Sequence, residues 1–163
     1  MSFHHNLLAK QHSKESLKPI LNSLMAEEKK VVFTNGCFDI LHRGHVEYLS
    51  KARDLGDYLI LGLNTDESVK RLGKSPERPI NNQETRAIIL AALSCVDAIV
   101  LFNEDTPLEL ITFLEPNILV KGSDYEAKNI VGYDVVTAKG GQVLTIDLVQ
   151  GFSTTKLIEK LKH

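Results

Sequence analysis

The chain has 163 residues, of which 43% are hydrophobic and 25% are charged, and this length and composition are typical of one globular domain. Its formal net charge of −2 argues against a nucleic-acid groove or an anionic membrane surface as partner, so local groups must hold any anionic ligand. Two cysteines are too few for a disulfide framework, and no apolar run resembles a signal peptide or a span of about 20 residues, so the sequence predicts a cytoplasmic protein.

Residues 1–30 predict an N-terminal helical extension, after which apolar strands alternate with helices. The apolar stretches predict five strands, at 31–35, 58–64, 98–102, 117–122 and 142–148. Helices are predicted at 46–55, 83–94, 107–115, 133–141 and 153–162. Strands that are apolar throughout, each followed by a helix, indicate a parallel sheet covered on both faces. The sequence therefore predicts a single α/β domain over residues 1–163, with a Rossmann-like, doubly wound, five-stranded parallel sheet and helices on both faces.

The stretch "NGCFDILHRGH" (35–45) follows the first predicted strand and opens a helix. Ligands of open parallel sheets bind at the carboxyl ends of the strands, where this loop lies. His42 and His45 are three residues apart, and Gly44 allows a close approach at the helix start. A helix N-terminus favours anions, and two imidazoles can donate to phosphate oxygens. The loop therefore predicts a phosphate site.

A metal site is the alternative interpretation of the same loop. It would recruit Cys37 or Asp39 alongside the two histidines. The chain offers no second cluster of ligands, and Asp39 is more useful as a polar anchor for the loop. The phosphate interpretation is therefore favoured.

The stretch 64–86 follows the second predicted strand and is rich in basic and turn residues. Lys70 and Arg71 are predicted to be solvated. Lys74 lies beside Gly73 on a loop that can fold over a triphosphate, which makes it the candidate for a mobile clamp. Arg86 lies in a predicted helix, and its side chain can lie on the surface or reach inward to the site.

Two further stretches follow strands at the same edge of the predicted sheet. "VKGSDY" (120–125) offers backbone and short polar groups for the ribose or base of a nucleotide. "GFSTTKL" (151–157) opens the last helix with three hydroxyl residues, although N-capping by Ser153 explains one of them. The chain has no Walker loop, so it is not a P-loop ATPase, and it has no G-x-S-x-G elbow either.

These motifs resemble those of a known superfamily. "GCFDILHRGHVEYL" resembles the H-x-G-H signature of the small nucleotidyltransferases, which include glycerol-3-phosphate cytidylyltransferase, and "GFSTTKLIEKL" is similar to their second phosphate-binding signature. A longer likeness, from about residue 30 to the C-terminus, is to the D-glycero-β-D-manno-heptose 1-phosphate adenylyltransferases. It is carried by "GLNTDESVKRLGKSPERPINNQETRAIILAAL", "VDAIVLFNEDTPLELI", "PNILVKGSDY" and "IVGYDVV".

The resemblance implies a single nucleotidyltransferase domain that transfers AMP from ATP to heptose 1-phosphate. The products would be ADP-heptose, a precursor of the lipopolysaccharide inner core, and pyrophosphate. Mg²⁺ would be carried with ATP. Many family members fuse this domain to a heptose kinase; here the resemblance implies a stand-alone domain, a separate heptose kinase upstream in the pathway and a homodimer.

The resemblance also implies roles for individual residues. The catalytic residues would be His42, His45 and Lys74, and no residue would be a metal ligand. The nucleotide would contact Asn35, Gly36, Phe38, Gly44, Lys121, Gly122, Asp124, Ser153, Thr154 and Thr155. The sugar phosphate would contact Asp39, Arg78 and Arg86. The family commonly has Lys-Gly-Gly-Asp where this chain has Ser123 in the third position, which would be strained if its φ were positive.

Two other functions remain open on the residues alone. A cytidylyltransferase that acts on a polyol phosphate such as glycerol 3-phosphate needs the same chemistry, because nothing here separates adenine from cytosine. A non-catalytic nucleotide-binding sensor or partner subunit is the second alternative. The presence of His42, His45 and Lys74 favours an enzyme, since a sensor does not need groups that stabilise a transition state.

Overall fold

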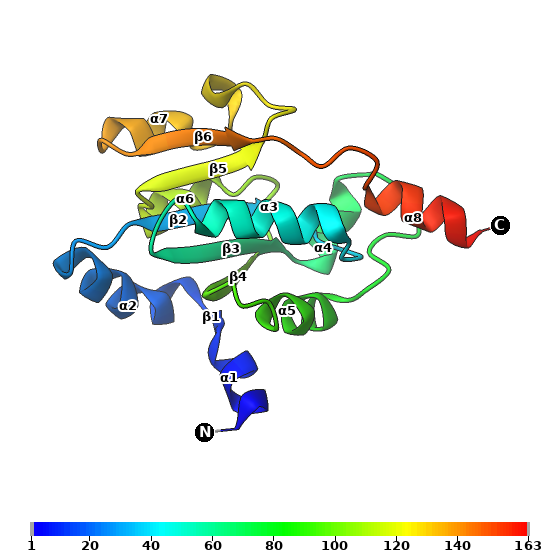
Figure 1. Cartoon of the computed structure of the whole chain (residues 1–163), viewed down its shortest axis with the longest axis horizontal. Coiled ribbons are helices and arrows are strands. Elements are labelled where there is room, and N and C mark those ends of the chain that lie inside the picture. The colour runs from blue at the N-terminus through cyan, green and yellow to red at the C-terminus, as the bar shows by residue number, and fades with distance from the viewer. Residues whose placement is uncertain (1, 163) are drawn as a thin grey trace.

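The computed structural model describes residues 2–162, which are built around a six-stranded sheet in the order β1-β4-β3-β2-β5-β6 (Figure 1). All neighbouring strands are parallel. The strands are β1 (Gln11–His12), β2 (Val31–Gly36), β3 (Tyr58–Asn64), β4 (Ala98–Phe102), β5 (Ile118–Gly122) and β6 (Gln142–Ile146). The predicted α/β class and parallel sheet are therefore confirmed.

The prediction of five strands was wrong by one. The additional strand, β1, lies within the stretch predicted to be a helical extension and pairs with the edge of β4 through Gln11 and Ile99. The Ile99 N–H donates to the Lys10 carbonyl over 2.8 Å. A strand of two residues has neither the length nor the alternation that a sequence pattern reveals. It forms here because the edge of β4 offers unpaired backbone groups.

Helices cover both faces of the sheet, as predicted. Buried side chains of α3 (Arg43–Arg53) and α5 (Gln83–Ala91) pack on one face together with Leu59, Leu61 and Leu63 of β3. Those of α2 (Lys14–Ala26), α6 (Leu108–Leu114) and α7 (Tyr133–Ala138) pack on the other face with Ile60. The alternation along β3 explains why this strand is apolar at nearly every position. The helices are α1 (Phe3–Ala9), α2 (Lys14–Ala26), α3 (Arg43–Arg53), α4 (Asp66–Arg71), α5 (Gln83–Ala91), α6 (Leu108–Leu114), η1 (Ala127–Asn129, a 3₁₀ turn), α7 (Tyr133–Ala138) and α8 (Thr154–Leu161).

The order of the strands reverses between β2 and β5. From β2 the chain moves outward through β3 to β4, and it then returns to place β5 on the other side of β2. In open α/β sheets such a switch point leaves a crevice at the carboxyl ends of the strands, where ligands bind. The C-terminal helix α8 extends beyond the carboxyl ends of the strands (Figure 1). Within residues 2–162, no helix is long and apolar enough to cross a membrane.

Two adjacent residues of α5 test how far the core extends. The side chain of Leu90 is fully buried, whereas Ile89 is 39% exposed. We expect Leu90→Ala to lower the free energy of unfolding by about 2–5 kcal/mol, because it leaves a cavity under the sheet. Ile89→Ala, the matched control, should change it by about 0.5 kcal/mol or less. Urea denaturation of both variants measures the difference, and equal losses would contradict this description of the core.

Candidate active site

A cavity of ≈ 510 Å³ opens at the carboxyl ends of β2 and β5, at the switch point. It is formed by the loop after β2, the start of α3, the loop between α4 and α5, the loop after β5 and the segment before α8. Its lining residues are Asn35, Gly36, Cys37, Phe38, His42, Gly44, His45, Tyr48, Lys74, Arg78, Lys121, Gly122, Asp124, Tyr125, Leu148, Val149, Phe152, Ser153, Thr154 and Thr155. The structure thus brings together every predicted site residue except Asp39 and Arg86.

His42 and His45 form a stacked pair at the start of α3. Their ring centroids are 3.8 Å apart and the rings are inclined by 21°. His42 is the N-cap of α3 and makes no capping hydrogen bond with its side chain. The Nδ1 atoms of both rings are buried and have no hydrogen-bond partner among the described residues. Since buried polar atoms are normally paired, these nitrogens are suited to a ligand or to the water it displaces.

Gly44 makes this packing possible. A Cβ atom at Gly44 would lie 3.0 Å from the ring of His42 and 3.2 Å from the Cβ of Phe152. Phe152 in turn stacks against His42 at 6.4 Å between ring centroids, and the Arg43 guanidinium lies 5.7 Å from the Phe152 ring. The close approach predicted at Gly44 is therefore made by the protein itself, and it joins the start of α3 to the segment before α8.

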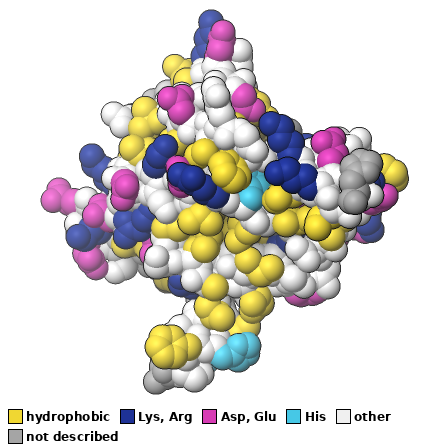
Figure 2. Space-filling model, turned by 45° about the vertical axis from the view of Figure 1, so that its right-hand side comes forward, with side chains coloured by type: hydrophobic (Ala, Val, Ile, Leu, Met, Phe, Trp, Pro, Cys, Tyr) yellow, Lys and Arg dark blue, Asp and Glu magenta, His cyan; other side chains and the backbone are white. Residues whose placement is uncertain are grey.

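In the free protein the pKa of each histidine lies below its ordinary value, which favours the neutral imidazole. Burial lowers the pKa of His42. Burial, followed by the charges of His42 and Arg78, lowers the pKa of His45 to about 4. Figure 2 shows a histidine side chain that reaches the surface with Lys or Arg side chains on either side. An anion placed among these groups would favour the protonated imidazoles, because it offsets the positive charges that now disfavour them.

The three hydroxyl residues at the start of α8 differ in whether their hydroxyl groups already have a hydrogen-bond partner. Ser153 accepts a hydrogen bond from the Lys156 N–H at 3.1 Å, which is the N-cap that the sequence allowed. Thr154 is buried, and its hydroxyl donates to the Ile40 carbonyl at 3.4 Å. The hydroxyl of Thr155 has no partner among the described residues. The start of α8 therefore offers the Thr155 hydroxyl and its backbone N–H groups to the cavity.

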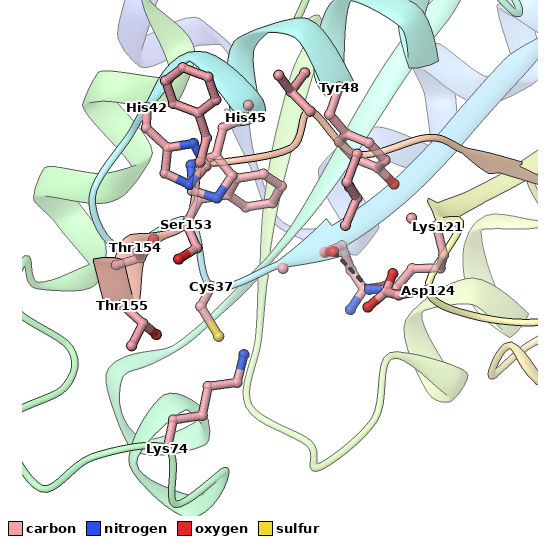
Figure 3. A pocket seen from close by; sticks show the side chains of 18 of the residues that line it. Cys37, His42, His45, Tyr48, Lys74, Lys121, Asp124, Ser153, Thr154 and Thr155 are labelled. Carbon is pink, nitrogen blue, oxygen red and sulfur yellow. Dashed lines mark hydrogen bonds between the residues drawn. The ribbon is translucent and has the colours of Figure 1, made fainter. Parts of the chain in front are cut away.

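Lys74 and Arg78 enter the cavity from the loop between α4 and α5. Lys74 is exposed, and its ammonium points toward Cys37 and the cavity (Figure 3). Arg78 is nearly buried, and its Nε lies 3.2 Å from the Asp39 Oδ2. The loop thus carries one cation that is free to move and one that is held in place.

Asp39 lies beneath the cavity and not in it. Its side chain is fully buried and accepts hydrogen bonds from Arg78 Nε at 3.2 Å and from the N–H groups of Ile80 and Asn81, each at 2.9 Å. The Asn81 side chain also donates to the Asp39 carbonyl at 2.8 Å. This placement does not support the predicted contact with the sugar phosphate, because the carboxylate is already occupied. It agrees with the other interpretation, a polar anchor for the loop.

Arg86 reaches inward, but it binds the backbone and not the cavity. The residue is 1% exposed. Its guanidinium donates to the carbonyls of Cys37 at 2.8 Å, Asn64 at 2.8 Å and Asn81 at 3.0 Å, and to the Asp66 carboxylate at 2.7 Å. The predicted contact of Arg86 with substrate is not supported by this placement, since all three nitrogens are engaged by the protein.

The loop after β5 closes the other end of the cavity. The Lys121 ammonium donates to the Asn35 carbonyl at 3.2 Å and lies 5.5 Å from the Tyr125 ring, and burial lowers its pKa. A Cβ atom at Gly122 would lie 2.7 Å from Asp124 Oδ1. Ser123 is not among the described residues with positive φ, so the strain considered for the Lys-Gly-Ser-Asp sequence does not arise.

Six lining residues were not among the predicted ones: Cys37, Tyr48, Tyr125, Leu148, Val149 and Phe152. Tyr48 lies one helical turn after His45, so its spacing was a usable signal. Its hydroxyl lies 2.8 Å from the Thr34 hydroxyl and donates to the Val120 carbonyl at 3.2 Å, and burial raises its pKa to about 12. Tyr48 therefore ties β2 to β5. Leu148 was predicted to end the last strand, but β6 ends at Ile146. Leu148 and Val149 belong to the irregular segment that follows, where the sequence pattern gives no sign of a site.

Within residues 2–162, no three His, Cys, Asp or Glu side chains are grouped as a metal site would require. The cavity instead presents imidazoles, cations, a helix start and hydroxyls. These groups can donate hydrogen bonds to an anion, and they come from separate segments of the sequence that meet at the switch point.

The cytidylyltransferase-like family model matches residues 33–160 of the chain. The chain is 58% identical over 148 residues to "Bifunctional protein HldE" of Syntrophotalea carbinolica, covering 91% of this chain and 30% of the relative. It is 54% identical to the protein of the same name from Campylobacter concisus, covering 99% of this chain and 33% of the relative. The chain thus spans about a third of the length of these relatives.

Solved structures give the same picture of the fold. The "lipopolysaccharide core biosynthesis protein" of Thermoplasma volcanium is 26% identical with a TM-score of 0.60, covering 74% of this chain and 97% of that protein. Pantoate-β-alanine ligase of Francisella tularensis, at 16% identity and a TM-score of 0.57, shares the fold, over 93% of this chain and 76% of the ligase.

The low pKa of His45 predicts how stability depends on pH. Because its folded pKa of about 4 lies below the unfolded value of about 6.5, the unfolded chain binds the proton more readily. The free energy of unfolding should therefore fall as the pH drops from 6.5 toward 4. In His45→Asn this loss should be smaller, by on the order of 1–2 kcal/mol at pH 5. Urea denaturation at pH 7, 6 and 5 measures it.

His5→Asn, on the exposed face of α1, is the matched control and should keep the pH dependence of the unaltered protein. Identical pH dependence in His45→Asn and the unaltered protein would show that the His45 imidazole is not disfavoured in its charged form.

Proposed function

The match of residues 33–160 makes the chain a member of the cytidylyltransferase-like family, and from this premise we propose that it is a heptose 1-phosphate adenylyltransferase. It would transfer AMP from ATP to D-glycero-β-D-manno-heptose 1-phosphate and release pyrophosphate. The observation that carries the proposal is the stacked pair His42 and His45, with buried unpaired nitrogens, at a helix start in a cavity also lined by Lys, Arg and hydroxyl side chains. The HldE relatives and the lipopolysaccharide core biosynthesis protein support the choice of acceptor.

The reaction needs no covalent intermediate. An oxygen of the heptose phosphate attacks the α-phosphorus of ATP, a new P–O bond forms, and the bond to the bridging oxygen of pyrophosphate breaks. The protein has to position two anions and stabilise charge on the five-coordinate phosphorus. His42 and His45 would donate hydrogen bonds to the α-phosphate oxygens, where negative charge accumulates.

Other segments of the cavity would hold the rest of the nucleotide. The start of α8, with the Thr155 hydroxyl, suits the β- and γ-phosphates. Lys74 would close over the α- and β-phosphates after ATP enters, because its loop is exposed and its ammonium already points to the cavity. Lys121, Gly122 and Asp124 would face the nucleoside at the opposite end.

Mg²⁺ belongs to this proposal as a companion of ATP. The chemistry of the cavity fits this role, because its side chains are mainly donors, and Asp39, the nearest buried carboxylate, is used by the loop. Bound by the phosphates, Mg²⁺ would neutralise part of their charge. The proposed acceptor would require a heptose kinase to supply it, and a cytoplasmic location and a homodimer stay predictions.

A pyrophosphate-release screen tests the proposal. ATP and CTP are each paired with heptose 1-phosphate and glycerol 3-phosphate. We expect the highest kcat/KM with ATP and heptose 1-phosphate. Preference for CTP and glycerol 3-phosphate would instead support a polyol-phosphate cytidylyltransferase. Nucleotide binding without pyrophosphate release in any pairing would indicate a sensor or partner subunit.

The role of His45 predicts a larger effect on turnover than on binding. His45→Ala should lower kcat by about 10²- to 10³-fold, or about 2.7–4 kcal/mol, because its hydrogen bond strengthens in the transition state. The Kd for ATP should rise by about tenfold at most, which corresponds to 1.4 kcal/mol. Steady-state kinetics and calorimetric titration measure the two effects. His5→Ala is the control, and a near-normal kcat in His45→Ala would remove this residue from the mechanism.

A further inference from the structure

A second cavity, of ≈ 180 Å³, adjoins the first one at the carboxyl end of the sheet. The two share Asn35, Lys121 and Tyr125. The remaining lining comes from the loop after β4 and from the segment around η1, namely Asp105, Thr106, Pro107, Asn129, Ile130 and Val131. We propose that this second cavity binds the sugar of the acceptor, with the acceptor phosphate directed past Lys121 into the first cavity. This inference rests on the proposed function.

The position of the second cavity suits an in-line displacement. Lys121 and Asp124 lie across the first cavity from Ser153, Thr154 and Thr155 (Figure 3). With the β- and γ-phosphates at the start of α8, pyrophosphate leaves on that side. The attacking oxygen must then approach the α-phosphorus from the opposite side, since the attacking and leaving oxygens are roughly in line. The second cavity joins the first at Asn35, Lys121 and Tyr125, which is that opposite side.

The polar side chains of the second cavity suit a hydroxylated ligand. Thr106 is exposed; its oxygen accepts a long hydrogen bond from the Leu108 N–H at 3.5 Å, and its O–H remains available to donate. Asn129 is exposed and donates to Glu126 at 3.4 Å, which leaves its carbonyl oxygen free to accept. The Asn35 amide offers both kinds of group. Sugar hydroxyls both donate and accept, so they match this set.

Apolar groups line the rest of the second cavity. The ring of Tyr125 and the side chains of Ile130 and Val131 can pack against the C–H face of a sugar ring. An acceptor with a long flexible chain or a second aromatic base would not use the three polar groups. The lining therefore favours a compact polyhydroxylated body.

Charge identifies which end of the acceptor faces the first cavity. Lys121 is the one Lys or Arg that lines the second cavity within the described residues, and it stands at the shared wall. The Asp105 carboxylate is paired with Arg71, whose Nε lies 2.8 Å from its Oδ1. This distribution of charge matches a ligand that has one phosphate, placed at Lys121, and an uncharged body that points toward Thr106. A nucleoside triphosphate does not match it.

Lys121 would also lower the repulsion between the two substrates. The acceptor phosphate and the α-phosphate are both anionic, and they must approach to bonding distance. The half-buried Lys121 ammonium lies between the nucleoside end of the first cavity and the second cavity, so it can interact with both anions. As the new P–O bond forms, the electron pair of the broken bond leaves on pyrophosphate, and no proton or further reactant is needed.

The test uses two variants of the second cavity, Thr106→Val and Asn129→Ala. Each should raise the KM for heptose 1-phosphate about tenfold, because it removes a hydrogen bond to a sugar hydroxyl. The kcat should stay within about threefold, and the Kd for ATP, from calorimetry without acceptor, within about twofold. Matched controls are Thr112→Val, whose hydroxyl bonds within α6, and Asn22→Ala, exposed on α2. Both should behave as the unaltered protein.

Three outcomes are informative. If the unaltered protein turns over heptose 1-phosphate and both variants keep its KM, the sugar lies elsewhere and the inference is overturned. If the Kd for ATP rises as much as the KM for the acceptor, the second cavity belongs to the nucleotide, which also overturns it. If the unaltered protein turns over no sugar phosphate, the proposed function itself fails, and the acceptor cavity fails with it.

Discussion

The geometry of the site depends on the hydrogen bonds that the Arg86 guanidinium donates. This guanidinium is buried, and it donates to backbone carbonyls at the end of β2, the end of β3 and the loop before α5, and to the carboxylate of Asp66 at the start of α4. These segments come from different parts of the sequence, and each carries or adjoins site residues. Breaking such a buried charged network costs about 3–5 kcal/mol, a large fraction of the stability of a domain. The loop that bears the histidines is therefore fixed relative to the loop that bears Lys74.

Asp39 extends this network to the far end of the Lys74 loop. Its carboxylate holds Arg78 and the N–H groups of Ile80 and Asn81, while Asp66 and Arg86 fix the near end at α4. The middle of the loop is tied to the rest of the protein by an exposed ion pair between Glu77 and Lys162, at 2.9 Å. Exposed ion pairs contribute about 0–1 kcal/mol, so this tie is weak. The loop thus has fixed ends and a central part that can close, which is the architecture a mobile clamp needs.

Much of the fold and of the site could be predicted from the sequence, because both follow from local sequence patterns. Continuous apolar strands reveal a parallel sheet, and a parallel sheet brings the loops after its strands to one edge. That is why the predicted residues of four separate segments converge on one cavity. Arg86 and Asp39 were identified as relevant, but their partners could not be predicted. A side chain's identity gives its charge and reach, whereas its partners depend on which carbonyls the folded chain leaves unpaired. The strand β1 escaped prediction for a similar reason, because the edge of β4 determines it.

The net charge of −2 is compatible with the proposed anion site, because the positive charge at the cavity is local. Lys74, Arg78 and Lys121 line the same cavity as the two imidazoles. Burial lowers the pKa of both imidazoles, and the charge of Arg78 further lowers the pKa of His45. Of these cations, Arg78 is already paired with Asp39, and Lys121 is held by the Asn35 carbonyl. In the proposed reaction, a bound phosphate would offset the positive charges that disfavour protonation of the imidazoles. Since the donors other than Lys74 are held in place before binding, the proposed transfer would need little reorganisation as charge develops on the α-phosphate. Lys74 is the one of the three cations without a protein partner in residues 2–162. In the proposed reaction it is therefore the cation that is free to move toward the α- and β-phosphates.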